Sequence, residues 1–224
     1  MASKAPRQTA ERIVASALGL FNRFGEPNVA ATMVAADLGI SPGNLYYHYP
    51  GKEDIVNHLF GKYLDDLQAL LPAAQDVKDL EDAWFFMHSL FELVWRYRFL
   101  YRDLNDLLSK YRQLEQQVKQ VLADKHAAFL TLLKRLDDQG LLTQNSTERD
   151  SSATQMLVML TWWLSYEYVR NPRHALEDAN AQGGVSRGAQ QVLGLLLPYL
   201  QAQAKAQLLA LLQMYSAPPS VEAT

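Results

Sequence analysis

Side chains able to donate hydrogen bonds gather between residues 41 and 52 of the chain. Tyr46, Tyr47 and His48 are consecutive, and two tyrosines and a histidine on so short a segment exceed what an ordinary core requires. Lys52 follows at the predicted start of a helix, where the helix dipole opposes its charge, so that packing alone does not explain it. These residues predict a surface that binds a partner. The alternatives are a packed Tyr46, a structural His48 and a solvated Lys52.

The sequence lacks the motifs that mark common catalytic sites. It contains no nucleophile elbow, phosphate-binding loop, dinucleotide-binding glycine motif or HExxH motif, its five histidines are scattered, and it has no cysteine. His88 and Glu92 are spaced to share a metal on one helix face, but a single pair is a weak metal site. We therefore predict no catalytic residue, no metal and no cofactor. An enzyme with an aromatic cavity, and a helical adaptor that binds proteins through its acidic part, are the alternative classes.

The net charge of −3 over 224 residues hides a polarised chain. Residues 1–52 carry five basic and three acidic side chains, a net of +2, and the remainder carries sixteen and twenty-one, a net of −5. No apolar run reaches the roughly 18–20 residues of a membrane-spanning helix, and the first residues contain no secretory apolar region. Together with the absence of cysteine, this predicts a cytoplasmic protein that does not bind membranes.

Apolar residues recur at three- and four-residue steps along the whole chain, which predicts an all-α fold. No strand-like alternation occurs, and residues 173–184 are predicted as a loop. Pro198 either kinks the last helix or begins a new one. The expected helices cover approximately residues 8–24, 29–38, 42–47, 55–71, 79–96, 99–109, 111–138, 150–168 and 185–214.

The first three predicted helices have the spacing of a helix-turn-helix unit. Ala35 is small enough for two helices to approach closely, and Gly39 permits the tight turn between them. Ile40 and Leu45 anchor the turn and the third helix in the core. Such a unit places the start of its second helix in the major groove of DNA, while flanking groups contact phosphates.

The run from Gly39 to Ile55, GISPGNLYYHYPGKEDI, resembles the signature of the TetR family of bacterial transcriptional repressors. That family has an aromatic-rich LY-x-H-F/Y followed by a loop and K-E-x-L/I, and the similarity covers about residues 8–60. It implies an N-terminal helix-turn-helix head and a larger helical domain for ligand binding and dimerisation. We expect the head at 1–52, the second domain at 53–216 and a flexible tail at 217–224.

The resemblance also implies roles for single residues. Tyr46 and His48 match positions that hydrogen-bond DNA phosphates, and Lys52 matches a lysine that contacts phosphate or supports that contact. Thr32 matches a position near the DNA backbone, whereas Ala30 lacks the hydroxyl that the family often has there. The positions that face the groove are Ser41, Pro42, Gly43, Asn44 and Tyr47. Among them Asn44 is the best candidate for a base contact, with adenine as its natural partner.

The same resemblance implies an effector pocket in the second domain. Aromatic residues concentrate between 84 and 101, although such stripes are more often core than pocket. The predicted pocket residues are Trp84, Met87, His88, Phe91, Trp95, Arg98, Tyr101, Trp162 and Tyr166. The charged neighbours either hold an acidic effector or form surface salt bridges. These neighbours are Arg96, Arg98, Arg102, Asp103 and Asp106.

Family members pair through their last two long helices, here about 150–168 and 185–200, and read a roughly palindromic operator. The predicted homodimer residues are Met156, Leu160, Trp163, Leu193, Leu196 and Leu197. The segments 25–29 and 40–48 also resemble a branch that includes regulators of polyhydroxyalkanoate storage. That branch implies a fatty-acid or acyl-coenzyme A effector. We expect a repressor that releases its DNA operator when the effector binds; the alternative is an activator of the same family.

Overall fold

The computed structural model describes residues 4–215, and the side chains of residues 8–215. The regular elements of this described part are all helices, as expected, and its extended pairing is limited to one isolated antiparallel bridge between Leu142 and Leu200. Among the helices of the same part, none is both long and apolar enough to cross a membrane.

The chain forms two compact units, each assembled from two separate stretches. The first unit contains Met1–Asp66 and Tyr97–Lys119, and the second contains Leu67–Arg96 and Gln120–Thr224. These units are defined by packing, whereas the division expected at residue 52 is one of function and stays a prediction. The expected tail, 217–224, lies outside the described residues.

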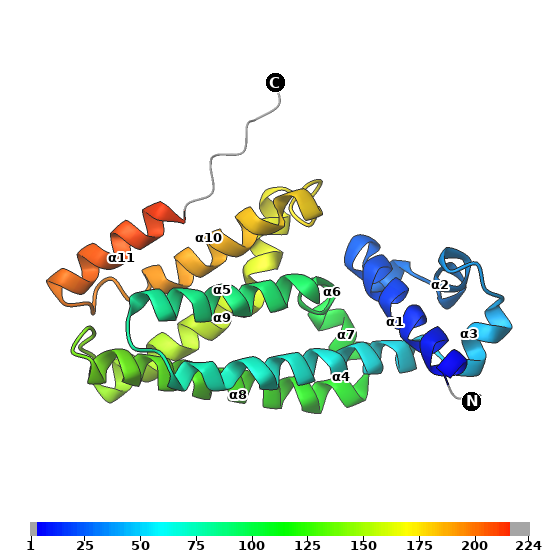
Figure 1. Ribbon diagram of the computed structural model, residues 1–224, viewed down its shortest axis with the longest axis horizontal. Coiled ribbons are helices and arrows are strands. Elements are labelled where there is room, and N and C mark those ends of the chain that lie inside the picture. The colour runs from blue at the N-terminus through cyan, green and yellow to red at the C-terminus, as the bar shows by residue number, and fades with distance from the viewer. Residues whose placement is uncertain (1–3, 216–224) are drawn as a thin grey trace, which may run out of the picture. The chain divides into compact units, whose positions relative to one another are not determined.

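The first unit is built around α1, which packs against α2 and α3 (Figure 1). Ile13, Ala17 and Phe21 form the apolar stripe of α1 and have no exposed surface, and Leu45 of α3 is equally buried. The helices with residues in this unit are α1 (Lys4–Phe24), η1 (Glu26–Asn28), α2 (Ala31–Asp37), α3 (Pro42–His48), α4 (Lys52–Leu70), α6 (Arg98–Arg102), α7 (Leu104–Lys110) and α8 (Arg112–Asp138). The end of α4, from Leu67, and most of α8, from Gln120, belong to the second unit.

The second unit is organised by α10, which packs along α5 and α9 (Figure 1). Gly188 of α10 permits this approach, because a Cβ added there would lie 2.5 Å from the Cε1 atom of Phe91. Asn145 and Glu148 form a capping box that starts α9. The elements that lie wholly in this unit are η2 (Leu71–Gln75), α5 (Leu80–Arg96), α9 (Ser146–Arg170), η3 (Asp178–Asn180), α10 (Ala181–Gly194) and α11 (Ala202–Met214).

Several boundaries differ from the sequence prediction; α9, for example, begins at Ser146 and not at about residue 150. The predicted loop 173–184 is too long, because α10 already begins at Ala181. Its early glycines are held by packing: the Trp163 indole N–H donates to the carbonyl oxygen of Gly184 at 3.0 Å. The predicted helix 99–109 is divided at Asp103. The last predicted stretch, 185–214, is divided between Gly194 and Ala202, which agrees with the alternative that a new helix begins after Pro198. Tertiary packing therefore outweighs the low helix propensity of glycine at the start of α10.

Candidate nucleic-acid interface

Helix α3 is started and oriented by its own first residues. Ser41 is its N-cap, and its Oγ accepts a hydrogen bond from the backbone N–H of Asn44 at 3.2 Å. Pro42 occupies the first helical position, where its missing N–H costs nothing. Gly39 adopts a φ of 64° in the preceding turn, a conformation that favours glycine. The backbone N–H of Ile40 then donates to the carbonyl of Ala35 at 3.0 Å, which ties this turn to α2.

The buried Leu45 turns the rest of α3 outward. Tyr46 and Tyr47 are 45% and 79% exposed, although both are large aromatic residues. The rings of Tyr47 and His48 meet edge to face, with centroids 5.1 Å apart, and His48 is half-buried. We call the exposed residues of this helix and its cap the α3 face; they are Ser41, Pro42, Gly43, Asn44, Tyr46 and Tyr47. Thr32 is exposed on α2.

Lys52 differs from the other predicted DNA contacts. Its Nζ lies 2.6 Å from Oε1 of Glu26, a fully buried carboxylate, and it also donates to the carbonyl oxygen of Glu26 at 3.0 Å. The Lys52 ammonium is therefore already paired with Glu26 of the same chain. The alternative of a merely solvated helix-start lysine does not fit this contact.

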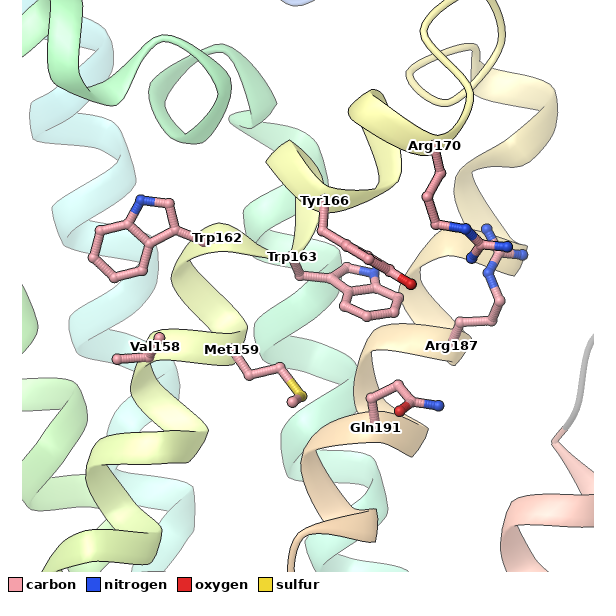
Figure 2. A pocket seen from close by; sticks show the side chains of 8 residues that line it. All are labelled: Val158, Met159, Trp162, Trp163, Tyr166, Arg170, Arg187 and Gln191. Atoms are coloured by element: carbon pink, nitrogen blue, oxygen red, sulfur yellow. The ribbon is translucent and has the colours of Figure 1, made fainter.

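A groove of about 420 Å³ lies on the surface of α9 and α10 in the second unit. Its wall includes the rings of Trp163 and Tyr166, whose centroids are 5.3 Å apart (Figure 2). Arg170 and Arg187 both bind the carboxylate of Glu167, which is 6% exposed. The residues that line the groove are Val158, Met159, Trp162, Trp163, Tyr166, Arg170, Arg187 and Gln191.

Two family models match the chain, one over each part. Residues 13–59, which contain the α3 face, match the model described as bacterial regulatory proteins of the tetR family. Residues 62–208 match a model described as bacterial transcriptional repressor, TetR. The chain belongs to the TetR family. The family consists of transcriptional regulators and not enzymes, as expected from the sequence.

Solved structures agree with this assignment. The chain is similar to a TetR-family transcriptional regulator from Marinobacter aquaeolei VT8, with 32% identity, a TM-score of 0.80 and coverage of 93% of this chain and 99% of that one. A SmeT–triclosan complex matches at 17% identity and a TM-score of 0.57, over 97% of this chain and 98% of that one. A gamma-butyrolactone receptor matches at 16% identity and a TM-score of 0.67, over 94% and 97%. The last two similarities concern the fold alone.

The predicted effector residues of this TetR-family chain are divided between the two units. Trp162 and Tyr166 line the α9–α10 groove, whereas Trp84, Met87 and Phe91 are buried in the second unit. Trp95 is half-buried, and His88 lies beside Glu92, its Nδ1 being 3.7 Å from Oε1. No group of three metal-ligating side chains occurs among the described residues. Arg98 and Tyr101 belong to the first unit and are buried there.

The predicted dimer residues are mainly internal to one chain. Met156, Leu160, Leu193 and Leu196 have no exposed surface, and Trp163 is 7% exposed. They hold α9 and α10 to the core and leave little area for a second copy. Leu197 is half-buried. The large exposed apolar side chains of α9 are instead Val158, Trp162, Tyr166, Tyr168 and Val169.

The charged residues after α5 include pairs within the first unit. The guanidinium of Arg102 binds both carboxylate oxygens of Asp103, each at 3.0 Å, and Asp106 pairs with Lys110 at 2.6 Å. Arg102, Asp103 and Asp106 therefore form salt bridges within the chain, which was the alternative to holding an acidic effector. Glu26 and Tyr111, which meet in the same unit, were missed by the sequence analysis. An isolated glutamate before a helix carries no sign that it is buried.

Proposed function

We propose that this chain is a ligand-responsive repressor that binds a palindromic DNA operator as a homodimer. The observation that carries the proposal is the α3 face, where Asn44, Tyr46 and Tyr47 are exposed while Leu45 alone anchors the helix. Adjacent exposed aromatic rings are typical of a surface that binds a partner. A short capped helix with its first residues exposed suits the major groove, which admits one α-helix.

Each residue of the interface has a distinct role in this proposal. Asn44 reads a base, for which adenine offers matching donor and acceptor groups. Tyr46 and His48 donate to phosphates, and Thr32 lies near the same backbone. Ser41 maintains the start of α3 through its bond to Asn44 N–H, and Pro42, Gly43 and Tyr47 face the groove. Lys52 supports these contacts through Glu26, since its ammonium is already paired.

The second copy covers the exposed stripe of α9. Val158, Trp162, Tyr166 and Val169 are 49%, 42%, 53% and 80% exposed, and their spacing places them along one side of the helix. An apolar stripe of this kind is typical of a surface that binds a protein. It takes over the role that the sequence analysis gave to Met156, Leu160, Trp163, Leu193, Leu196 and Leu197. A symmetric pair presents two α3 faces to the two halves of an operator.

A small apolar or acyl effector would bind in the second unit and release the operator. Two TetR-fold structures are named for such molecules, triclosan and gamma-butyrolactone. The second unit is rich in large buried apolar side chains, among them Trp84, Met87 and Phe91. A ligand of this class is recognised by such surroundings through burial of its apolar area. Repression is favoured because the family model over 62–208 describes a repressor.

The test is a gel shift with DNA taken from upstream of the protein's own gene. We expect a complex that weakens steeply as salt rises, because contacts to phosphates release counterions. Addition of medium-chain acyl-coenzyme A, as the probe, should release the DNA. A reporter driven by that DNA should be silenced by the protein; activation of the reporter would contradict repression, and the absence of any complex would contradict DNA binding.

A further inference from the structure

Glu26 is a buried charge at the point where the chain leaves α1. It lies in η1, and its side chain has no exposed surface. Burying a carboxylate is costly unless cations and hydrogen-bond donors surround it. Its partners therefore indicate which segments of the chain this carboxylate holds together.

The partners come from the far end of the helix-turn-helix segment and from the corner between α7 and α8. Lys52, the first residue of α4, lies 2.6 Å from Oε1 of Glu26. The hydroxyl of Tyr111 donates to the same Oε1 at 2.6 Å, and the Nζ of Lys110 lies 3.6 Å from Oε2. We call these four residues the Glu26 cluster. Residues 26 and 52 enclose α2 and α3, so one carboxylate joins the two ends of this segment to the α7–α8 corner.

The backbone beside Glu26 is held by a second set of contacts. The Glu26 N–H donates to Oδ2 of Asp103 at 3.1 Å, and Asp103 is in turn bound by Arg102. Gly25 has a φ of 87°, and a Cβ added to it would clash with Nη2 of Arg102. The turn between α6 and α7 therefore fits closely around residues 25 and 26.

The hydroxyl of Tyr111 stays protonated and can donate its hydrogen bond to Glu26 at any pH near neutrality. Burial and the neighbouring Glu26 carboxylate raise the pKa of Tyr111, and Glu53 and Asp106 act in the same direction. The tyrosine consequently remains protonated at neutral pH and donates to the carboxylate.

We propose that Glu26 is a positioning residue for operator recognition, which holds the segment from residue 26 to residue 52 against the α7–α8 corner through Lys52 and Tyr111. The inference rests on the proposed function. Base reading requires α3 at a defined angle, whereas non-specific binding requires only charge near phosphates. Weakening the Glu26 cluster should therefore reduce affinity for the operator more than affinity for unrelated DNA.

The test compares Tyr111→Phe, Glu26→Gln and the double variant by their dissociation constants for two duplexes. One duplex is the operator selected with the wild-type protein from random DNA, and the other is the same sequence scrambled. Tyr97→Phe is the matched control, because the hydroxyl of Tyr97 also donates to a carboxylate of the first unit, Asp66 at 2.9 Å, outside residues 26–52. Stoichiometric titration gives the active fraction of each preparation, so that loss of folded protein is not counted as loss of affinity.

We expect Tyr111→Phe to weaken operator binding about tenfold while scrambled DNA is bound within about twofold of wild type. The double variant should lose less binding free energy than the two single variants lose together, because the Tyr111 hydroxyl and the Glu26 carboxylate belong to one hydrogen bond, so that their effects are not additive. Equal weakening for both duplexes, additive effects, or a Tyr97→Phe change as large as that of Tyr111→Phe would overturn the inference. If Glu26→Gln does not fold, Tyr111→Phe decides alone. A wild-type protein that selects no sequence would instead contradict the proposed function.

Discussion

The Nζ of Lys52 lies 2.6 Å from Oε1 of Glu26, and the glutamate has no exposed surface. Replacing Lys52 by methionine would leave this buried carboxylate without its closest cation. We expect Lys52→Met to lower the free energy of unfolding by about 3 kcal/mol, because a buried carboxylate that loses its nearest cation is costly, even with Lys110 and Tyr111 in place. Urea unfolding followed by circular dichroism measures this change. Lys62→Met is the control, since Lys62 is exposed on the same helix; equal effects of the two substitutions would argue against a structural ion pair.

Asn44→Ala tests base reading by the α3 face. Loss of two hydrogen bonds to one base should cost about 1–3 kcal/mol on the operator and relax the preference at a single base pair. Binding to operators mutated at every position provides the measurement. Asn105→Ala, at an exposed asparagine of α7, should leave the preference unchanged. A uniform loss over all sequences would assign Asn44 to the DNA backbone.

Trp162→Arg tests whether a second copy covers the stripe on α9. A buried, unpaired charge at this point should shift the protein from dimer to monomer at micromolar concentration. Sedimentation equilibrium reports the mass directly. Tyr168→Arg is the matched control, because Tyr168 is 40% exposed on the same helix but lies off the stripe. Dimers that persist in Trp162→Arg and dissociate in Tyr168→Arg would place the interface elsewhere.

Lys125 gives a pH-dependent prediction. Burial lowers its pKa from 10.5 to about 7, so between these values the unfolded chain binds a proton that the folded chain does not. Proton uptake by the unfolded chain therefore lowers the free energy of unfolding as the pH falls from about 10.5 to about 7. Lys125→Met should stabilise the protein by about 3–5 kcal/mol at pH 7 and by much less above pH 10. A gain in melting temperature that is the same at pH 7 and pH 10 would show that burial of this charge is not responsible.

Gly188→Ala tests the packing of α10 on α5. The added Cβ would lie 2.5 Å from the Phe91 ring, so overpacking should destabilise the protein by about 1–3 kcal/mol. Gly194→Ala, at the end of the same helix, meets no heavy atom within 4 Å and should stabilise slightly. Thermal unfolding of both variants measures these two changes in stability. A neutral Gly188→Ala would mean that Phe91 moves aside without cost.

The sequence predicted the helices and the α3 face because both depend on local signals. Ser41 and Pro42 mark the start of α3 by their chemistry, and Gly39 marks the turn. Apolar spacing placed Leu45 in the core, and the structure buries it completely. These features need no knowledge of distant residues.

Other features depend on contacts between residues far apart in the chain. The buried position of Glu26 follows from Tyr111, which is 85 residues away, and from Lys52. The predicted dimer residues were chosen as apolar, but apolarity alone does not tell whether α5 or a second copy covers a helix face. Leu160 is fully buried while Trp162, two residues later, is 42% exposed. Such distinctions require the packed structure.

Sequencing of genomic fragments retained by the wild-type protein tests the central claim most directly, with the Asn44→Ala variant processed in parallel. The account predicts that wild type enriches one roughly palindromic sequence, that retention falls steeply with salt, and that Asn44→Ala retains fragments with a relaxed preference at one position of each half-site. Failure of the wild-type protein to enrich any sequence at low salt would contradict it.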